Sequence, residues 1–357
     1  MAAGPQDMKR IDHKKLTRFV SRSFEKLNVT AADAEIAAKV LVASDLRGVD
    51  THGVIRFNRY SWYVKWLTEG SMTARPNIRV VSESATTALL DGDRGMGMVI
   101  GHRAMETAIQ KARSAGIAMV GVRNSRHYGM SAYYSMLALP HDMIGIAMTN
   151  ASRQVVPTFG RESKYGTNPL CFAVPTNKEL PFVLDMATTT AAAGKLELAA
   201  RLGKSIPGGW AVDGNAEATH DPRVAQQARK LLPLGGTRDG GSHKGYGLGI
   251  LVEILCGVLT GTITALNDNQ DPRGHFFGAI RVDAFRPAAE FKQDMDRLIL
   301  DLKATPPVKG QQRVYVAGEI EFETAAERAE HGIPLHNSVL KGLRDVGEQL
   351  GVPYDLE

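Results

Sequence analysis

Cysteine and aromatic residues are scarce in this chain, and long apolar runs are absent. Only two of the 357 residues are cysteine, Cys171 and Cys256, and 6% are aromatic. Neither cysteine has a neighbouring Cys or His at the spacing of metal ligands, so we expect no zinc site and two buried free thiols in a reducing compartment. No run reaches the length of a membrane span, and MAAGPQDMKR at the N-terminus has no apolar signal core. These absences predict a cytoplasmic protein without a membrane partner.

Charge of one sign is not concentrated either. Lys and Arg number 43 against 38 Asp and Glu, and the net charge of +5 is spread along the chain. Proteins that bind nucleic acid cluster their basic residues and interleave aromatics with them, so nucleic acid is not an expected partner. A mildly basic surface does favour anionic substrates and phosphate-bearing cofactors. The length allows two or three domains, and 43% apolar with 23% charged residues is typical of a soluble globular protein.

Helix and strand patterns divide the chain into regions. Residues 8–70 predict helices, including one that begins at the N-cap Thr30 with Asp33 three positions on. Between 78 and 190 strands alternate with helices, and one helix there is expected to end at Gly116. These strands are expected to be buried on both faces, so the fold class is α/β or α+β.

The C-terminal half continues with helices and isolated strands. KGYGLGILVEILCGVL at 244–259 is apolar almost all round and predicts a buried central helix. HFFGAIRV at 275–282 and RVYVAGEI at 313–320 predict strands, with a polar helix near 288–303 between them. A last helix is expected at about 335–351, where it can pack on the N-terminal helices.

A glycine cluster at 95–101 comes close to a dinucleotide-binding turn but fails as one. The Rossmann pattern G-x-G-x-x-G is followed by an acidic residue about twenty positions on. Here the last glycine comes one residue late, and the next strand ends in arginine and asparagine. Three other junctions, 124–131, 185–190 and 240–245, offer backbone amides, hydroxyls and one lysine. Together they favour a phosphate-bearing ligand.

The segment DLRGVDTHGVIR at 45–56 carries the strongest chemical signal. Its histidine, His52, can exchange a proton near neutral pH, and Arg56 can grip a carboxylate with two hydrogen bonds. The pair is the minimum needed to oxidise or reduce a carbon next to a carboxylate. A structural histidine at a helix end and an arginine in a surface ion pair would give the same two residues. The other motifs must therefore decide between these roles and a catalytic one.

Eight motifs in order resemble the malate/L-lactate dehydrogenase-like family of NAD(P)-dependent oxidoreductases, which includes sulfolactate, ureidoglycolate and diketogulonate enzymes. Any one motif is weak, but all eight in sequence are a strong signal, and the resemblance covers nearly the whole chain. They are D-x-x-G-x-x-S/T-H-G-x-x-R at 45–56, N-S-x-H-x-G at 124–129, G-T-N-P-L at 166–170, L-D-M-A at 184–187, G-K-x-E-x-A at 194–199, I-P-x-G-W at 206–210, P-L-G-G at 233–236 and H-K-G-Y-G-L at 243–248.

The resemblance implies a non-Rossmann fold whose core is a mixed-sheet nucleotide-binding unit. This core is expected over 76–304, and a helical domain over 1–75 is joined by about 305–357 from the other chain end. The resemblance also implies a homodimer and direct hydride transfer between a small carboxylate substrate and NAD or NADP. Among the 2-hydroxy acids, malate is the expected substrate.

The same resemblance implies roles for individual residues. His52 looks like the acid/base, and Asp185 and Thr51 look like groups that orient its imidazole. Arg56 looks like the clamp for the substrate carboxylate, with His127 and Thr167 as further substrate-binding residues. The residues expected at the cofactor are His127, Tyr128, Gly129, Met130, Ser131, Asn168, Leu184, Asp185, Met186, Ala187, Thr188, Thr189, His243, Lys244, Gly318, Glu319 and Ile320.

Several alternatives stay open. A reductase of cyclic imino acids would use the same histidine, and a non-catalytic ligand-binding relative would have lost it. The second carboxylate of malate needs another cation, for which Arg47, Arg59 and Arg126 are candidates. Thr51 stands where many relatives have serine, and Ala193 where they often have arginine. The choice between NAD and NADP is open, because no residue can be assigned to the adenosine ribose.

Overall fold

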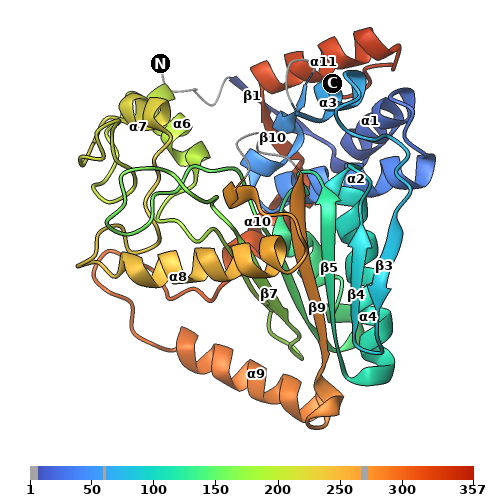
Figure 1. Cartoon of the computed structure of the whole chain (residues 1–357), viewed down its shortest axis with the longest axis vertical. Coiled ribbons are helices and arrows are strands. Elements are labelled where there is room, and N and C mark those ends of the chain that lie inside the picture. The colour runs from blue at the N-terminus through green and yellow to red at the C-terminus, as the bar shows by residue number, and fades with distance from the viewer. Residues whose placement is uncertain (1–6, 59–61, 267–271) are drawn as a thin grey trace.

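The computed structural model describes residues 7–58, 62–266 and 272–357 of the 357-residue chain. It is a mixed α/β fold with helices packed around one large sheet (Figure 1). Its helices are α1 (His13–Lys26), α2 (Ala31–Leu46), α3 (Trp62–Thr68), α4 (Gly97–Ala115), α5 (Ser131–Met136), α6 (Ala193–Arg201), α7 (Pro222–Ala228), α8 (Ser242–Glu253), α9 (Ala288–Lys303), α10 (Glu319–His331) and α11 (Asn337–Leu350). Its strands are β1 (Met8–Ile11), β2 (Phe57–Asn58), β3 (Arg79–Glu83), β4 (Thr87–Asp91), β5 (Ile117–Ser125), β6 (Met143–Thr149), β7 (Leu170–Val174), β8 (Phe182–Met186), β9 (Arg273–Arg281) and β10 (Ile333–His336).

The large sheet has the strand order β3-β4-β5-β9-β6-β7-β8. β4 and β5 pair in parallel through the crossover helix α4, and the other pairs in the sheet are antiparallel. A Rossmann sheet is mostly parallel, so the expected non-Rossmann mixed sheet is confirmed. The glycines near the start of α4 serve packing, because a Cβ at Gly97 would lie 2.1 Å from the carbonyl oxygen of Arg126.

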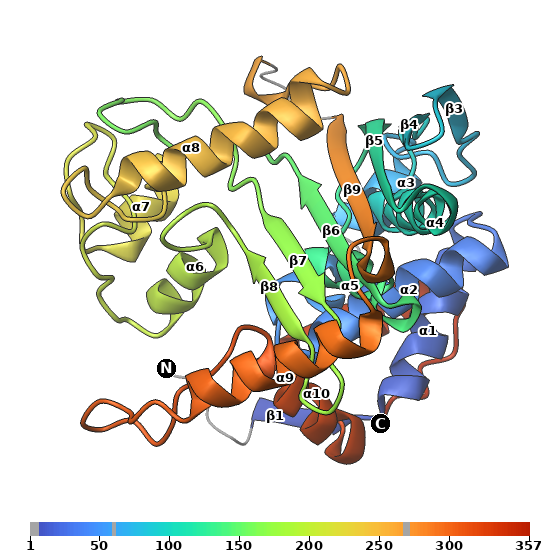
Figure 2. The same cartoon turned by 90° about the horizontal axis from the view of Figure 1, so that it is seen from below.

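Alternating side chains give the sheet two buried faces. On β9, Phe277 belongs to the main core beside α4 and α5, whereas its neighbour Phe276 packs in a second cluster with Val252 and Cys256 of the α8 region. This is the period of two that a strand imposes on its side chains. Figure 2 shows the consequence, with α8 crossing one face of the sheet and α2, α4 and α5 covering the other.

Two predicted helix ends are confirmed. The Thr30 hydroxyl accepts a hydrogen bond from the Asp33 amide at 3.3 Å, which caps α2. Gly116 ends α4 at a positive φ of 84°, a conformation that favours glycine.

Two other expectations were wrong. The helix at 244–259 is not central, because it packs on the sheet through Val252 and Cys256 but leaves Leu251 and Val258 46% and 56% exposed. The apolar outer face of this helix is therefore exposed on the surface of the chain. The segment 313–320 is not a strand: its first residues are irregular, and α10 begins at Glu319.

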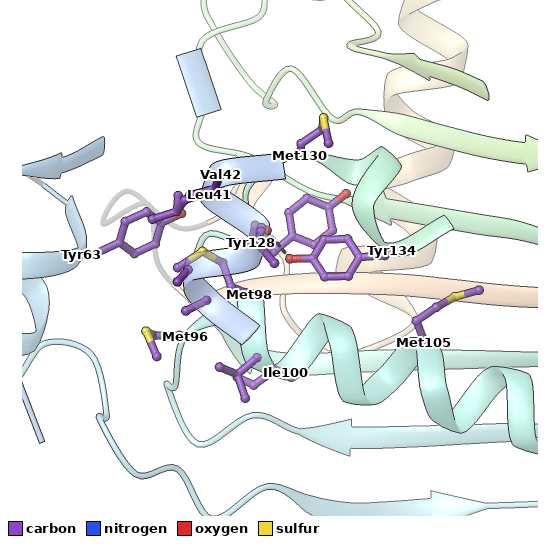
Figure 3. Packing of buried hydrophobic residues seen from close by; sticks show 14 of the residues in the cluster. Leu41, Val42, Tyr63, Met96, Met98, Ile100, Met105, Tyr128, Met130 and Tyr134 are labelled. Atoms are coloured by element: carbon purple, nitrogen blue, oxygen red, sulfur yellow. Dashed lines mark hydrogen bonds between the residues drawn. The ribbon is translucent and has the colours of Figure 1, made fainter. Parts of the chain in front are cut away.

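The two chain ends lie together. β1 pairs antiparallel with β10, and α11 contacts both α1 and the short 3-10 turn Val54–Arg56. Residues of these helices and of the large sheet share one continuous hydrophobic cluster, part of which is shown in Figure 3. Domain boundaries at 75 and 305 stay a prediction, but the helical part and the sheet share a core.

Candidate active site

Two 3-10 turns, Asp50–His52 and Val54–Arg56, follow α2 and end at the candidate site residues His52 and Arg56. Asp45, near the end of α2, fixes them because its buried carboxylate accepts a hydrogen bond from the Val54 amide at 2.8 Å. A Cβ at Gly53 would lie 1.8 Å from this carboxylate, so glycine is required there. Asp45 thus fixes the backbone of the T-H-G motif.

His52 is held by its neighbour and stacked on a second histidine. The Thr51 hydroxyl lies 2.9 Å from Nδ1 of His52, and the rings of His52 and His127 are 5.6 Å apart at 22°. Burial, and then the charge of Arg56, lower the pKa of His52 to about 4. The ring is therefore neutral near pH 7 and can accept a proton. Among the described residues no protein group bonds to its Nε2.

Arg56 is oriented by its own backbone and by an aromatic ring. Its Nε donates to the Thr51 carbonyl at 2.7 Å, and its guanidinium lies 4.5 Å from the centre of the Trp62 ring. This cation–π contact aligns the plane of the guanidinium. In the described ranges the two Nη groups have no hydrogen-bond partner, so they can take a carboxylate.

Trp62 and Tyr63 belong to the site, and the sequence reading missed them. The edge of Trp62 meets the His127 ring at 4.5 Å and 89°, and the Tyr63 hydroxyl lies 2.6 Å from Nδ1 of His127. A signal for them existed, because WYVKW at 62–66 is a dense aromatic run in a chain with 6% aromatic residues.

Asp185 lies apart from His52. Its carboxylate accepts a hydrogen bond from the Ala132 amide at 2.7 Å, and no hydrogen bond joins it to His52 in the part of the chain that the structure describes. The side chain is exposed at the surface, yet the protein packed around the carboxyl reduces its hydration and raises its pKa to about 6, against the opposing effects of the Ala132 hydrogen bond and the charge of Arg47. Its role in orienting the imidazole stays a prediction.

The segments expected at the cofactor converge on β8. The Val183 amide donates to the Ala317 carbonyl at 3.0 Å, just before Gly318. Beyond the strand, the Thr188 amide donates to the Thr167 carbonyl at 2.9 Å and the Thr188 carbonyl accepts from Leu234 at 3.0 Å. The start of α6 then approaches the turn that carries His52, because a Cβ at Gly194 would lie 2.7 Å from the Thr51 methyl group.

Several of these residues use their side chains for the fold. The Tyr128 and Ser131 hydroxyls bond to each other at 2.5 Å, and Met130 is buried. The Asn168 amide donates to Gly249 and Glu253, and Glu319 pairs with Lys303 at 3.0 Å. The Thr189 hydroxyl is buried and donates to the Ala191 carbonyl at 2.9 Å. The remaining expected residues keep exposed or half-buried surface or are glycines; they are Gly129, Leu184, Met186, Ala187, His243, Lys244, Gly318 and Ile320.

Glu253 anchors the loop that carries Asn168. Its buried carboxylate accepts from the amides of Asn150 and Asn168, the Thr264 hydroxyl and the Ala265 amide, at 3.1–3.4 Å. Every partner is a donor, so the side-chain NH₂ group that Glu253→Gln introduces would face another donor. We expect the free energy of unfolding to fall by about 1–3 kcal/mol in urea denaturation.

The control for this stability prediction is Glu348→Gln, on the exposed side of α11. This variant should keep the wild-type midpoint. Equal midpoints for both variants would contradict the anchoring role of Glu253.

The start of α8 presents cationic side chains at the surface. Gly241 precedes the helix at a φ of 90°, and no side chain caps the first amides. His243 and Lys244 are exposed there, and Arg238 donates to Nδ1 of His243 at 2.9 Å. The Ser242 and Lys244 amides already donate to the Thr237 and Gly241 carbonyls at 2.9 Å, so it is the charged side chains here that favour an anion.

The described ranges contain neither a cluster of metal-ligating residues nor a membrane-spanning helix. No group of three or more His, Cys, Asp or Glu residues among them is arranged to hold a metal ion. None of the described helices has the length and apolarity to cross a membrane.

Comparison with known proteins identifies relatives over the whole chain. The malate/L-lactate dehydrogenase family model matches residues 11–344. The malate dehydrogenase of Pyrococcus abyssi is 42% identical over 349 residues, 96% of this chain and 95% of that protein. Malate dehydrogenase from Entamoeba histolytica has a similar crystal structure, with a TM-score of 0.93, 33% identity and coverage of 98% of this chain and 100% of that one. For delta1-piperideine-2-carboxylate reductase from Pseudomonas syringae the TM-score is 0.84 at 26% identity, covering 95% and 99%.

Fold, site and relatives define an oxidoreductase, a 2-hydroxyacid dehydrogenase that uses NAD or NADP. The chain belongs to the malate/L-lactate dehydrogenase family, and the resemblance of its eight motifs is confirmed. Small carboxylates are the substrates of this class.

Proposed function

We propose that the protein interconverts malate and oxaloacetate with NAD or NADP. The observation that carries the proposal is the pairing of a neutral His52, held by Thr51, with the aligned and accessible guanidinium of Arg56. One group exchanges a proton, and the other holds the carboxylate next to the reacting carbon. The 42% identity to a malate dehydrogenase selects malate among the 2-hydroxy acids.

In the oxidation direction His52 Nε2 takes the proton of the substrate hydroxyl. Arg56 holds the adjacent carboxylate, and the half-buried position of His52 limits water at the reacting carbon. The cofactor supplies the acceptor for the hydride that leaves the same carbon. In reduction, protonated His52 returns the proton to the oxygen. Thr51 keeps the ring oriented in both directions.

The residues that would hold the cofactor line β8 and the start of α8. Lys244 would offer a cation for the diphosphate. The Leu184–Thr189 stretch, Thr167 and the backbone near Gly318 border the same strand and would meet the remainder of the molecule. Asp185 stays our candidate for a second orienting group.

For the second carboxylate we propose Arg273. Of the earlier candidates, Arg47 stacks on the Phe322 ring, Arg126 donates to the Ser71 carbonyl, and Arg59 lies outside the described residues. Arg273 donates to the Ser152 hydroxyl at 2.6 Å. The charge of Arg273 helps to lower the pKa of His127 after the larger effects of burial and His52, so it acts within the site.

A steady-state assay tests the function. NADH and NADPH are each offered with oxaloacetate, pyruvate and the cyclic imine delta1-piperideine-2-carboxylate. We expect the highest kcat/KM with oxaloacetate, and pyruvate to be disfavoured because it lacks the second carboxylate. No turnover of any keto acid would refute the proposal.

The second candidate function is reduction of cyclic imino acids. It is supported by the structural similarity to the piperideine-carboxylate reductase, with a TM-score of 0.84. The same His52 would then protonate nitrogen instead of oxygen. A higher kcat/KM for the imine than for oxaloacetate would select it.

We also propose that the protein acts in the cytoplasm as a homodimer whose contact includes the outer face of α8 and of the π-helical segment Ile254–Val258 that continues it. Below, this combined surface is called the α8 face. Leu248, Leu251, Ile254 and Val258 recur there every three or four residues and are exposed. Exposed apolar patches of this kind mark protein contacts. Light scattering should therefore give twice the chain mass of 38.7 kDa, and Leu251→Asp should give the monomer.

Leu302→Asp is the matched control for the dimer. Leu302 is 45% exposed on α9, close to the 46% of Leu251, but lies outside the α8 face. This variant should stay dimeric. A monomeric wild type, or a dimeric Leu251→Asp variant, would contradict the proposed contact.

A further inference from the structure

Two donors meet the same nitrogen of His127. The Tyr63 hydroxyl lies 2.6 Å from Nδ1, and the Gly129 amide donates to it at 3.3 Å. A backbone N–H can only donate, so Nδ1 carries no proton. In the neutral ring the proton therefore sits on Nε2.

The ring is neutral at ordinary pH. Burial lowers the pKa of His127 well below its usual value, and the charges of His52, Arg273, Arg56 and His275 act in the same direction. Within the described residues no protein group bonds to Nε2. Its N–H is thus a donor without a protein acceptor, beside the ring of His52.

We infer that Tyr63 is a positioning residue that, together with the Gly129 amide, locks His127 as the Nε2–H tautomer, so that His127 donates a hydrogen bond to the reacting oxygen of the substrate. His52 then remains the group that exchanges the proton. The inference rests on the proposed function and deepens it. It gives the two stacked histidines different tasks, acid/base for one and a neutral donor that stabilises developing negative charge on oxygen for the other.

Tyr63 is built to hold this bond. Its side chain is fully buried in the main core cluster, where Figure 3 shows it. Burial raises the pKa of its phenol, so the hydroxyl keeps its proton at every working pH. Trp66 packs edge-on against Tyr63, and the edge of Trp62 fixes the His127 ring from another side. A buried phenol without its partner would be costly, so the pair is mutually constrained.

Nitrogen NMR of the full chain, labelled with ¹⁵N-histidine, tests the tautomer directly. His127→Gln identifies the His127 signals. We expect Nε2 to be protonated and Nδ1 to be unprotonated throughout about pH 6–8. A ring protonated on Nδ1, or on both nitrogens, would overturn the inference even if no variant of Tyr63 folds.

Tyr63→Phe tests the positioning role. Without the hydroxyl we expect a second tautomer in the spectrum and a kcat lowered by about tenfold, the scale of one hydrogen bond, with the KM for the cofactor unchanged. Tyr133→Phe is the matched control, because it removes a tyrosine hydroxyl that lies 3.4 Å from Nδ1 of His102. This control should keep the wild-type kcat and the His127 spectrum.

The outcomes separate the two proposals. A Tyr63→Phe enzyme with the kcat and spectrum of the Tyr133→Phe control would refute the role of Tyr63 while leaving malate as the substrate. A protein that turns over no hydroxy acid would refute the proposed function, and the wild-type spectrum would still decide the tautomer.

Discussion

Replacement of His52 by alanine should lower kcat for malate oxidation by about 10²–10⁴-fold, the range that a general acid or base contributes. Removing the imidazole leaves the substrate proton without an acceptor at the one position that Thr51 orients. Arg56 and the residues near β8 are untouched, so the affinity for NADH should stay close to that of the wild type. Stopped-flow turnover and a fluorescence titration with NADH measure the two effects separately.

His331→Ala provides the control for this loss. His331 is an exposed histidine near the end of α10, and its removal should leave both measurements unchanged. A His52→Ala enzyme with turnover near the wild-type value would remove His52 from the mechanism.

The pKa of His52 also fixes a pH window. Because burial and Arg56 lower this pKa from 6.5 to about 4, the unfolded chain binds a proton at this site between these values and the folded chain does not. The contribution of His52 to stability is thus present above about pH 6.5 and declines as pH falls toward 4. In kcat/KM for oxidation, the acid limb should lie near the lower value.

Replacement of Arg56 by glutamine should lower kcat/KM for malate by about 30- to 4,000-fold, since removing one partner of a hydrogen-bonded charge pair costs about 2–5 kcal/mol. It should have a second effect. The charge of Arg56 helps to hold the pKa of His52 down, so its loss should move the acid limb of the pH profile upward. The two effects are read from one set of pH-dependent progress curves.

Arg56→Lys separates charge from geometry. Lysine keeps the positive charge but cannot offer two parallel N–H groups, so the acid limb should stay in place while KM for malate rises. If glutamine and lysine move the limb equally, the charge of Arg56 does not control His52. If neither changes KM, Arg56 is not the carboxylate clamp.

The sequence predicts best where one rule governs many residues. Short β-rich apolar runs and a glycine helix end locate β4 to β9 and the C-terminus of α4, and the T-H-G motif leads to His52 and Arg56. The prediction fails at 313–320, where the β-rich pattern indicates a strand. Instead α10 begins at Glu319, whose carboxylate accepts a hydrogen bond from the Val316 amide and pairs with Lys303. Local propensity cannot anticipate such a tertiary partner.

The apolar run at 244–259 shows a different limit. A helix that is apolar all round is normally buried within its own chain, but α8 meets the sheet on one side only. The pattern cannot distinguish a chain's own core from a surface intended for another molecule.

The role of His127 could not be predicted in full from the sequence either. The residue was predicted to touch substrate or cofactor, but its tautomer depends on Tyr63, 64 positions away. Its pKa depends on burial and on charges from two distant segments, the turns that carry His52 and Arg56 and the β9 residues Arg273 and His275. No spacing rule carries that information, because the contact exists only after α3 has packed into the core.

The pairing of β1 with β10 has a consequence for biosynthesis. His52 is translated within the first sixth of the chain, yet the helix that contacts its neighbouring turn, α11, ends at Leu350 of 357 residues. Domains fold on the ribosome from the N-terminus as their parts emerge. Here β10 and α11, which contact β1 and the Val54–Arg56 turn, are translated long after His52. The nascent chain therefore carries His52 through most of elongation before these two contacts can form.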